Sequence, residues 1–227
     1  SNSVWFPTID KPNQKTTQEL YMTVPDKFVT LSNGILKSST KENGGLRTDY
    51  WVMDKKHAPY LFFMGVGEYA IVKDKWKNIA VDYYVEKEYE PYAKQIFGMT
   101  PEMLDFFSKK LKYEYPWQKY AQLVGRDYVS GAMENTTAVI HGEYANLKEG
   151  DLVDENTWEP VIAHELFHHW FGDLVTAESW SNLTVNESFA NYSEYLWNEY
   201  KYGKDAADYH LMIDISAYIH NPLNYNK

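Results

Sequence analysis

Up to about residue 90, the chain alternates apolar and polar positions in the manner of β-strands. Residues 18–25 (QELYMTVP) alternate strictly enough to predict a strand, and residues 59–72 (PYLFFMGVGEYAIV) form a longer β-prone stretch. An Asn33-Gly34 pair separates two further strand-like runs, which is a strong signal for a β-hairpin. We therefore expect residues 1–90 to be the end of an all-β domain, either a sandwich or a saddle-shaped sheet.

After residue 90 the apolar positions follow helical spacing. Met103, Leu104 and Phe107 recur at the period of one helix face. Further helical and strand-like segments follow in alternation: strands at 121–125 and 136–144, and helices at 157–172, 185–203 and 205–219. The pattern predicts an α+β protein in which residues 91–227 form a second domain with a mixed sheet and helices.

Composition narrows the range of partners. The formal net charge of -10 over 227 residues argues against nucleic acid or an anionic membrane, because both attract clustered Lys and Arg. No apolar run approaches the roughly 20 residues that a transmembrane helix needs. The absence of cysteine excludes disulfides and thiolate metal sites. Neither a compartment nor an oligomeric state follows from these numbers.

The stretch VIAHELFHHWFG contains the most informative pattern, His164-Glu165-Leu166-Phe167-His168. Positions i and i+4 share one face of a helix, so both imidazoles can reach a single metal ion. Glu165 lies about 100° round the helix, where it can contact a metal-bound water without binding the metal. His169 points away and is not expected to be a ligand. The remaining histidines have no metal-type spacing and are expected at the surface or in the core: His57, His141, His210 and His220.

A hydrolytic zinc ion needs a third protein ligand and one open position for water. Glu187, on the next predicted helix, is the candidate, because a helix, a loop and a second helix can bring it beside His164 and His168. Helical phase places Asn191 and Glu194 near the same face, where either could accept a ring N–H from a zinc-bound histidine. The sequence thus predicts one Zn²⁺ held by His164, His168 and Glu187.

Three segments together resemble the zinc aminopeptidases of the aminopeptidase N family: HELFHHWFGDLVT, SWSNLTVNESFA and the upstream GAMEN. These enzymes are gluzincins, and the resemblance implies a catalytic domain built like thermolysin. It extends over nearly the whole chain, since WFPTIDKPNQKTTQELYMTVP resembles the end of the family's N-terminal β domain. The resemblance therefore implies a zinc-dependent aminopeptidase.

The resemblance also implies roles for the GAMEN residues. The backbone at Gly131 and Ala132 would align the substrate strand, and Glu134 would bind the free α-ammonium group of a peptide. A carboxylate at the blind end of a groove pairs with a terminal amine and leaves no room for preceding residues. Glu165 would act as the general base. The expected partner is thus a peptide with a free N-terminus.

The chain departs from the family pattern at His169, Asp173 and Ser188, where glutamine, asparagine and glycine are usual, but none of these is an expected ligand. The family's oxyanion-stabilising tyrosine lies in a Tyr-x-Lys-Gly setting well downstream. The sequence Tyr225-Asn226-Lys227 is similar to the start of this pattern but follows Glu187 too closely, so we expect Tyr225 to be an ordinary loop residue.

A second amine-anchoring residue of the family would precede Ser1. The resemblance therefore implies a fragment, cut close to the active site on both sides. Two alternatives stay open at this point. One is a zinc endopeptidase with the same ligands, and the other is a catalytically incomplete fragment that binds peptides without cleaving them.

Overall fold

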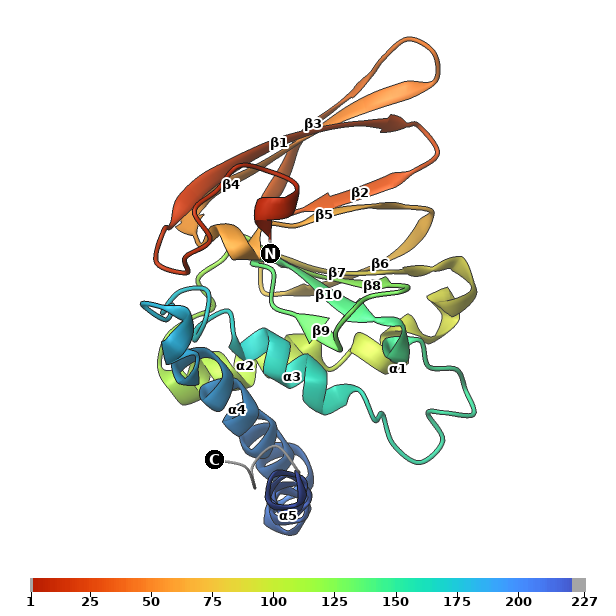
Figure 1. Ribbon diagram of the computed structural model, residues 1–227. Helices are drawn as coiled ribbons and strands as arrows, with labels where there is room; N and C mark the ends of the chain where they lie inside the picture. Colours follow the sequence, from red (N-terminus) through yellow and green to blue (C-terminus); the bar gives the residue numbers. More distant parts are fainter. Residues whose placement is uncertain (1, 222–227) are drawn as a thin grey trace.

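The structure is a computed structural model that describes residues 2–221 (Figure 1). Its strands are β1 (Thr16–Pro25), β2 (Val29–Ser32), β3 (Ile35–Lys41), β4 (Leu46–His57), β5 (Met64–Gly67), β6 (Tyr69–Trp76), β7 (Ile79–Glu86), β8 (Lys119–Gly125), β9 (Ala132–Met133) and β10 (Ala138–Gly142). Its α-helices are α1 (Ala93–Phe97), α2 (Thr100–Leu111), α3 (Glu159–Phe167), α4 (Thr184–Tyr202) and α5 (Lys204–His220). Short 3₁₀ helices lie at Asn2–Val4, Pro59–Leu61, Lys87–Tyr92, Glu143–Ala145 and Trp180–Asn182.

The strands form three sheets with the orders β1-β4-β3, β2-β5 and β6-β7-β8-β10-β9. In the five-stranded sheet β8 runs parallel to both β7 and β10, and the outer pairs are antiparallel. Figure 1 shows the two small sheets on one side of the five-stranded sheet and the helices on the other. This arrangement confirms the α+β class, with strands first and helices in the second part.

The five-stranded sheet joins the two parts of the chain. Strands β6 and β7 precede residue 90, whereas β8 follows it, and β7 pairs with β8 along five residue pairs from Ala80↔Lys119 to Tyr84↔Leu123. The expected boundary near residue 90 therefore falls between two neighbouring strands of one sheet. A division into 1–90 and 91–227 stays a prediction.

One hydrophobic core lies on each face of the five-stranded sheet. On one face, Tyr83 and Tyr120 pack with helix residues such as Phe107 and Trp197. On the other face, Tyr84 and Leu123 pack against Trp51 and its neighbours on the small sheets. Because successive strand residues point to opposite faces, β7 and β8 contribute to both cores. The sheet thus holds the helices and the N-terminal strands in a fixed relation.

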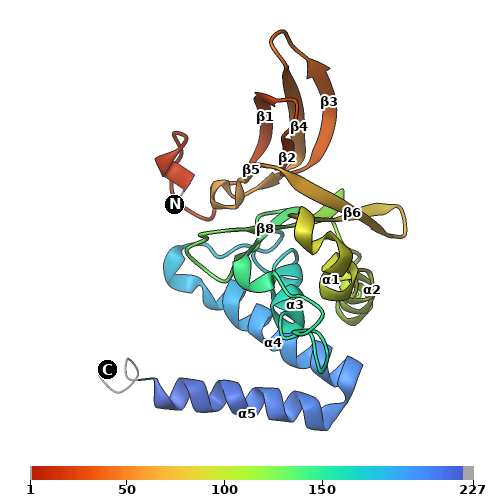
Figure 2. The ribbon, with the colours of Figure 1, turned by 90° about the vertical axis from the view of Figure 1, so that its right-hand side faces the viewer.

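The last helix has a different environment. In Figure 2, α5 runs across the end of α4, on the side away from the sheets. Ala207 is the buried residue of α5, and most of its other side chains are exposed. Among residues 2–221, we find no helix with both the length and the apolar character needed to span a bilayer.

The expected hairpin at Asn33-Gly34 is wrong. β2 pairs with β5, and β3 pairs with β4, so the two residues connect different sheets. Gly34 has φ +73°, and a Cβ at this position would lie 1.9 Å from the carbonyl oxygen of Val52. The glycine is therefore required by close backbone approach as well as by its left-handed conformation.

The side chain of Asn33 explains why this turn does not close a hairpin. Its Nδ2 donates to the carbonyl oxygens of Leu61 at 3.0 Å and Thr136 at 2.7 Å, and its Oδ1 accepts from the N–H of Phe63 at 2.7 Å. The N–H of Gly34 donates to Oγ1 of Thr137 at 2.8 Å. The turn is thus an anchor between the N-terminal strands and the segment that follows β9.

Replacing Asn33 with alanine should therefore destabilise the fold strongly. Asn33 is 1% exposed, so its loss leaves buried backbone groups without partners. Each such group costs about 1–3 kcal/mol, so we expect the free energy of unfolding in urea to fall by roughly 3 kcal/mol or more. Asn13→Ala is the matched control, because Asn13 is exposed and its side-chain amide donates one hydrogen bond, to Glu178. Equal effects of the two substitutions would contradict this account.

Candidate functional site

Helices α3 and α4 pack side by side and position the predicted metal ligands. His164 lies in α3, His168 is the residue directly after its end, and Glu187 lies in α4. The carboxylate of Glu159, in the first turn of α3, accepts hydrogen bonds from Trp197 at 2.5 Å and Tyr202 at 2.9 Å, near the end of α4. Further along, the hydroxyl of Ser193 donates to the carbonyl oxygen of Ala163 at 3.3 Å. These contacts hold the helices antiparallel, so the end of α3 meets the beginning of α4.

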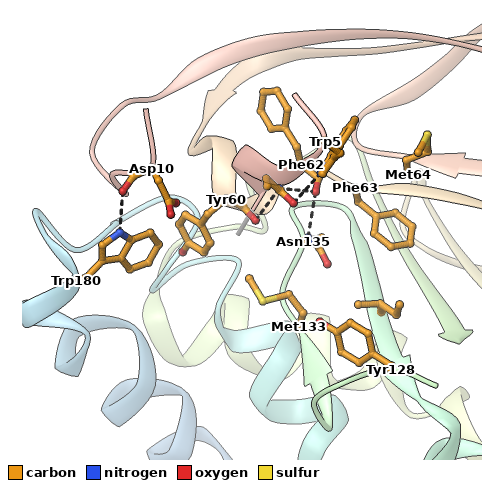
Figure 3. Close-up of a pocket in the computed structure, with 12 residues that line it drawn as sticks. Trp5, Asp10, Tyr60, Phe62, Phe63, Met64, Tyr128, Met133, Asn135 and Trp180 are labelled. Carbon is orange, nitrogen blue, oxygen red and sulfur yellow. Dashed lines mark hydrogen bonds between the residues drawn. The ribbon is translucent and has the colours of Figure 1, made fainter. Parts of the chain in front are cut away.

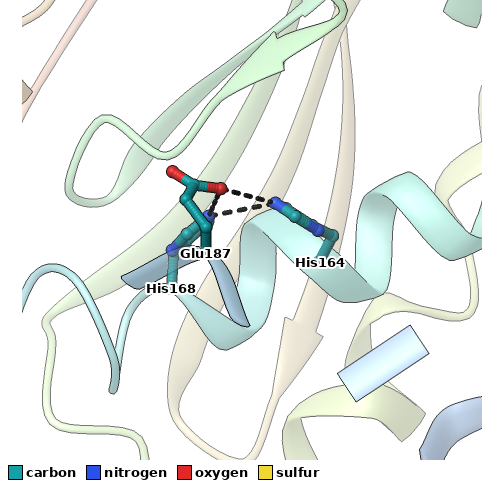
Figure 4. A group of neighbouring side chains, drawn as sticks. All are labelled: His164, His168 and Glu187. Carbon is teal, nitrogen blue, oxygen red and sulfur yellow. Dashed lines mark hydrogen bonds and ion pairs between the residues drawn. The ribbon is translucent and has the colours of Figure 1, made fainter. Parts of the chain in front are cut away.

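At that meeting point, His164, His168 and Glu187 converge (Figure 4). The two ring Nε2 atoms lie 3.1 Å apart. Oε2 of Glu187 lies 3.5 Å from Nε2 of His164 and 3.7 Å from Nε2 of His168. Ligand atoms of a tetrahedral zinc ion stand roughly 3.3 Å apart when the bonds are about 2.0–2.1 Å long. The spacing of the three atoms fits one such ion.

In both rings, the hydrogen bond made by Nδ1, the nitrogen facing away from Glu187, determines what Nε2 can bind. Nδ1 of His168 donates to the carbonyl oxygen of Phe171 at 3.0 Å, and Nδ1 of His164 donates to Oε1 of Glu194 at 2.8 Å. A neutral imidazole that donates through Nδ1 presents a lone pair at Nε2. Two such lone pairs and a carboxylate oxygen then face one point, and this donor set suits a divalent cation of the zinc type.

The same three groups shift one another's pKa values. Burial lowers the pKa of His164, but hydrogen bonds with Glu187 and Glu194 outweigh it and raise the value to about 9. Burial also lowers the pKa of His168, and the negative charge of Glu134 with the Glu187 hydrogen bond raises it to about 10. The hydrogen bonds from both rings hold the pKa of Glu187 well below its usual range. The local field therefore favours positive charge among the rings and carboxylates.

Glu165 lies beside this group. Its side chain is buried, and burial raises its pKa above the usual range. Its Oε2 has no hydrogen-bond partner within the described residues. Carboxylate oxygens of Glu165 and Glu134 and a ring nitrogen of His168 all lie within 4.8 Å of one another. Glu165 is thus close enough to exchange a proton with a molecule bound between these groups.

The GAMEN residues form an edge of the five-stranded sheet. Ala132 lies in β9, which pairs with β10, and the carbonyl oxygen of Gly131 accepts a hydrogen bond from Gly142 at 2.7 Å. The following Glu134 is buried, and Oε1 accepts from the hydroxyl of Tyr60 at 3.3 Å. The structure thus brings Glu134 to the proposed ligands, while the role of the Gly131 and Ala132 backbone stays a prediction.

His169 points away from the metal ligands and joins two parts of the site. Its Nε2 accepts a hydrogen bond from the N–H of Thr137 at 2.9 Å, and its Nδ1 donates to the carbonyl oxygen of Glu165 at 3.2 Å. Burial lowers the pKa of His169 to about 3, which keeps the ring neutral. The ring therefore fixes the end of α3 against the segment that follows Glu134.

A cavity of about 550 Å³ lies beside the segment that contains Glu134. Figure 3 shows the residues that line it. Met133 and Asn135, the neighbours of Glu134, line it together with aromatic side chains of Trp5, Tyr60, Phe62, Tyr128 and Trp180. Tyr60 connects the cavity to the surroundings of the proposed ligands. Its hydroxyl donates a hydrogen bond to Glu134 and accepts one at 3.1 Å from Asn186, the neighbour of Glu187 on α4. The lining of this cavity is mostly aromatic and apolar.

The structure also shows which expectations from the sequence meet at the site. Glu194 contacts a proposed ligand, whereas Asn191 is exposed and makes no hydrogen bond to either ring within the described part of the chain. Tyr60 and His210 were not expected here. Tyr60 belongs to the stretch 59–72, whose composition predicted only a strand, but it lies in the 3₁₀ helix Pro59–Leu61. His210 has no metal-type spacing to another histidine. Tyr225 lies outside the described residues.

Comparison with known proteins decides the family. Residues 96–221 match the peptidase family M1 domain, and residues 2–61 match the peptidase M1 N-terminal domain. The chain belongs to peptidase family M1. This match confirms the resemblance to the aminopeptidase N family, and it agrees with the order of the all-β part and the helical part in the fold.

Several M1 relatives align over most of the chain. Human (Homo sapiens) glutamyl aminopeptidase is 30% identical over 84% of this chain and 20% of its own length. Aminopeptidase N of Streptomyces lividans is 31% identical over 83% of this chain and 22% of its own length. Aminopeptidase M1-B of Oryza sativa subsp. japonica is 30% identical over 95% and 26%. The M1 chain described here thus spans about a fifth to a quarter of these relatives.

The contact of His169 with Thr137 predicts a difference between two substitutions. His169→Leu leaves the buried N–H of Thr137 without an acceptor, which should lower the free energy of unfolding by about 1–3 kcal/mol. His169→Gln should cost clearly less, because its carboxamide oxygen can accept the same hydrogen bond. Both variants lose the ring contacts with Tyr115 and Tyr120 and the hydrogen bond from Nδ1 to the carbonyl oxygen of Glu165, so the comparison isolates the acceptor for Thr137. Urea unfolding of the metal-free proteins tests this, and equal losses would refute it.

Proposed function

We propose that this M1 chain binds one Zn²⁺ through His164, His168 and Glu187 and removes the N-terminal residue from peptides. The observation that carries the proposal is the convergence of two ring nitrogens and one carboxylate oxygen at separations of 3.1–3.7 Å. Membership of a peptidase family supports the reaction class. The names of the similar proteins support cleavage at the N-terminus rather than within a chain.

The chemistry then divides between the ion and the protein. Bound Zn²⁺ would supply Lewis acidity, which polarises the scissile carbonyl and makes water a better nucleophile near neutral pH. Glu165 accepts the proton of the attacking water and donates it to the leaving amine. Its burial and its unpartnered Oε2 support this role, because a raised pKa suits a group that both takes and returns a proton.

Glu134 would select the bond that is cleaved. Its carboxylate lies within 4.8 Å of Glu165 and His168, so an ammonium group bound there would place the first peptide bond next to the base. The hydroxyl of Tyr60 donates to Glu134 and helps to fix the carboxylate. The first side chain would then enter the aromatic cavity beside Met133.

Glu165→Gln should separate metal binding from catalysis. The amide cannot accept the water's proton, so turnover of an aminoacyl anilide should fall at least about 100-fold, while zinc stays at about one ion per chain. Metal analysis and steady-state rates on the same preparations test this. Glu199→Gln is the control, since Glu199 is exposed on α4. Turnover like that of the unchanged protein in Glu165→Gln would remove Glu165 from the mechanism.

The role of Glu134 predicts dependence on a free amine. An N-acetylated peptide should be cleaved at least about 100-fold less efficiently than the same peptide with a free N-terminus, because the buried carboxylate of Glu134 is then left without a cationic partner. Glu134→Gln should lose most of this preference, whereas Glu143→Gln, which changes an exposed residue, should retain it. The ratio of kcat/KM for the two peptides measures the effect. Equal cleavage by the unchanged protein would favour an endopeptidase instead.

A further inference from the structure

The outer nitrogens of the two proposed metal-binding rings are held in different ways. Nδ1 of His168 donates to a backbone carbonyl, that of Phe171, whose position is set by the chain itself. Nδ1 of His164 donates to the carboxylate of Glu194, a side chain of α4 with rotatable bonds of its own. Glu194 is partly exposed, so solvent can compete for its oxygens. The orientation of His164 therefore depends on what holds Glu194.

The second oxygen of Glu194 is bound from α5. Nε2 of His210 lies 3.1 Å from Oε2 of Glu194, and it donates, because a carboxylate only accepts. A second carboxylate, that of Asp214, lies 3.7 Å from the same nitrogen, which is beyond hydrogen-bond distance. His210 and Glu194 are both partly buried between α4 and α5. One oxygen of Glu194 is thus occupied by His164 and the other by His210.

We propose that His210 is a positioning residue of the metal site, which orients Glu194 so that His164 presents Nε2 to the ion. The inference rests on the zinc site of the proposed function and extends it to α5, a helix that contributes no ligand. With both oxygens bonded, Glu194 has one preferred orientation, and hydrogen bonds in such a chain strengthen one another. Without His210, Glu194 can turn toward solvent and leave His164 free to rotate.

Zinc affinity tests this without relying on activity. Loss of a hydrogen-bond partner of a metal-binding histidine typically weakens metal affinity about 10–100-fold. His210 is one hydrogen bond further from the ion than Glu194, so we expect His210→Phe to weaken Zn²⁺ binding about 3–10-fold. His210→Gln should stay within about twofold of the unchanged protein, because its side-chain N–H can replace the imidazole N–H. Competition with a chromophoric chelator for Zn²⁺ gives the dissociation constants.

His220→Phe is the matched control, because His220 is exposed on the same helix and bonds Ser216 within it. It should leave Zn²⁺ affinity unchanged. In a Glu194→Ala background, His210→Phe should have no further effect, since the proposed influence passes through Glu194.

A second readout follows the ring directly. In the zinc-loaded protein, the Nδ1–H proton of His164 should exchange with solvent faster in His210→Phe than in His220→Phe, as NMR can measure. Unchanged affinity in His210→Phe, or an equal loss with and without Glu194, would overturn the inference while leaving the zinc site intact. A chain that binds no zinc at all would instead overturn the proposed function.

Discussion

The site depends on hydrogen bonds to the far side of two imidazole rings. Phe171 and Glu194 each accept a hydrogen bond from a ring Nδ1–H, so that the neutral rings of His164 and His168 direct the lone pairs of their Nε2 atoms at one point. Antiparallel packing of α3 on α4 adds the carboxylate of Glu187. The distance from this point to Glu187 depends on how α3 packs on α4, so a small shift between the two helices would change it.

The N-terminal strands take part in the site although they carry none of the proposed ligands. Asn33 binds Thr136, and the neighbouring Thr137 receives hydrogen bonds from Gly34 and Lys119 and donates one to His169. The turn after Glu134 is thus fixed from the strands on one side and from the end of α3 on the other. The two parts of the chain therefore meet between Glu134, the proposed amine-binding residue, and the proposed metal ligands.

Sequence periodicity predicted correctly those features that depend only on residues close together in the chain. The helical spacing of Met103 and Phe107 predicted α2, and the i, i+4 spacing of His164 and His168 placed both rings on one face. The hairpin prediction failed because the partners of Asn33 lie far away in sequence, beyond what turn propensity can register. His210 was missed for the same reason: its contact depends on the angle between α4 and α5, and no spacing rule encodes that angle.

The short strand β9 lies at the edge of its sheet, next to Glu134. A peptide bound along this edge would be recognised mainly by hydrogen bonds to its main-chain N–H and C=O groups, which are the same for nearly every residue. Such recognition is indifferent to most side chains beyond the first. Proline is the exception, because it lacks the N–H and resists the extended pairing. Under the proposed function, a proline near the N-terminus of a peptide would therefore halt the removal of residues.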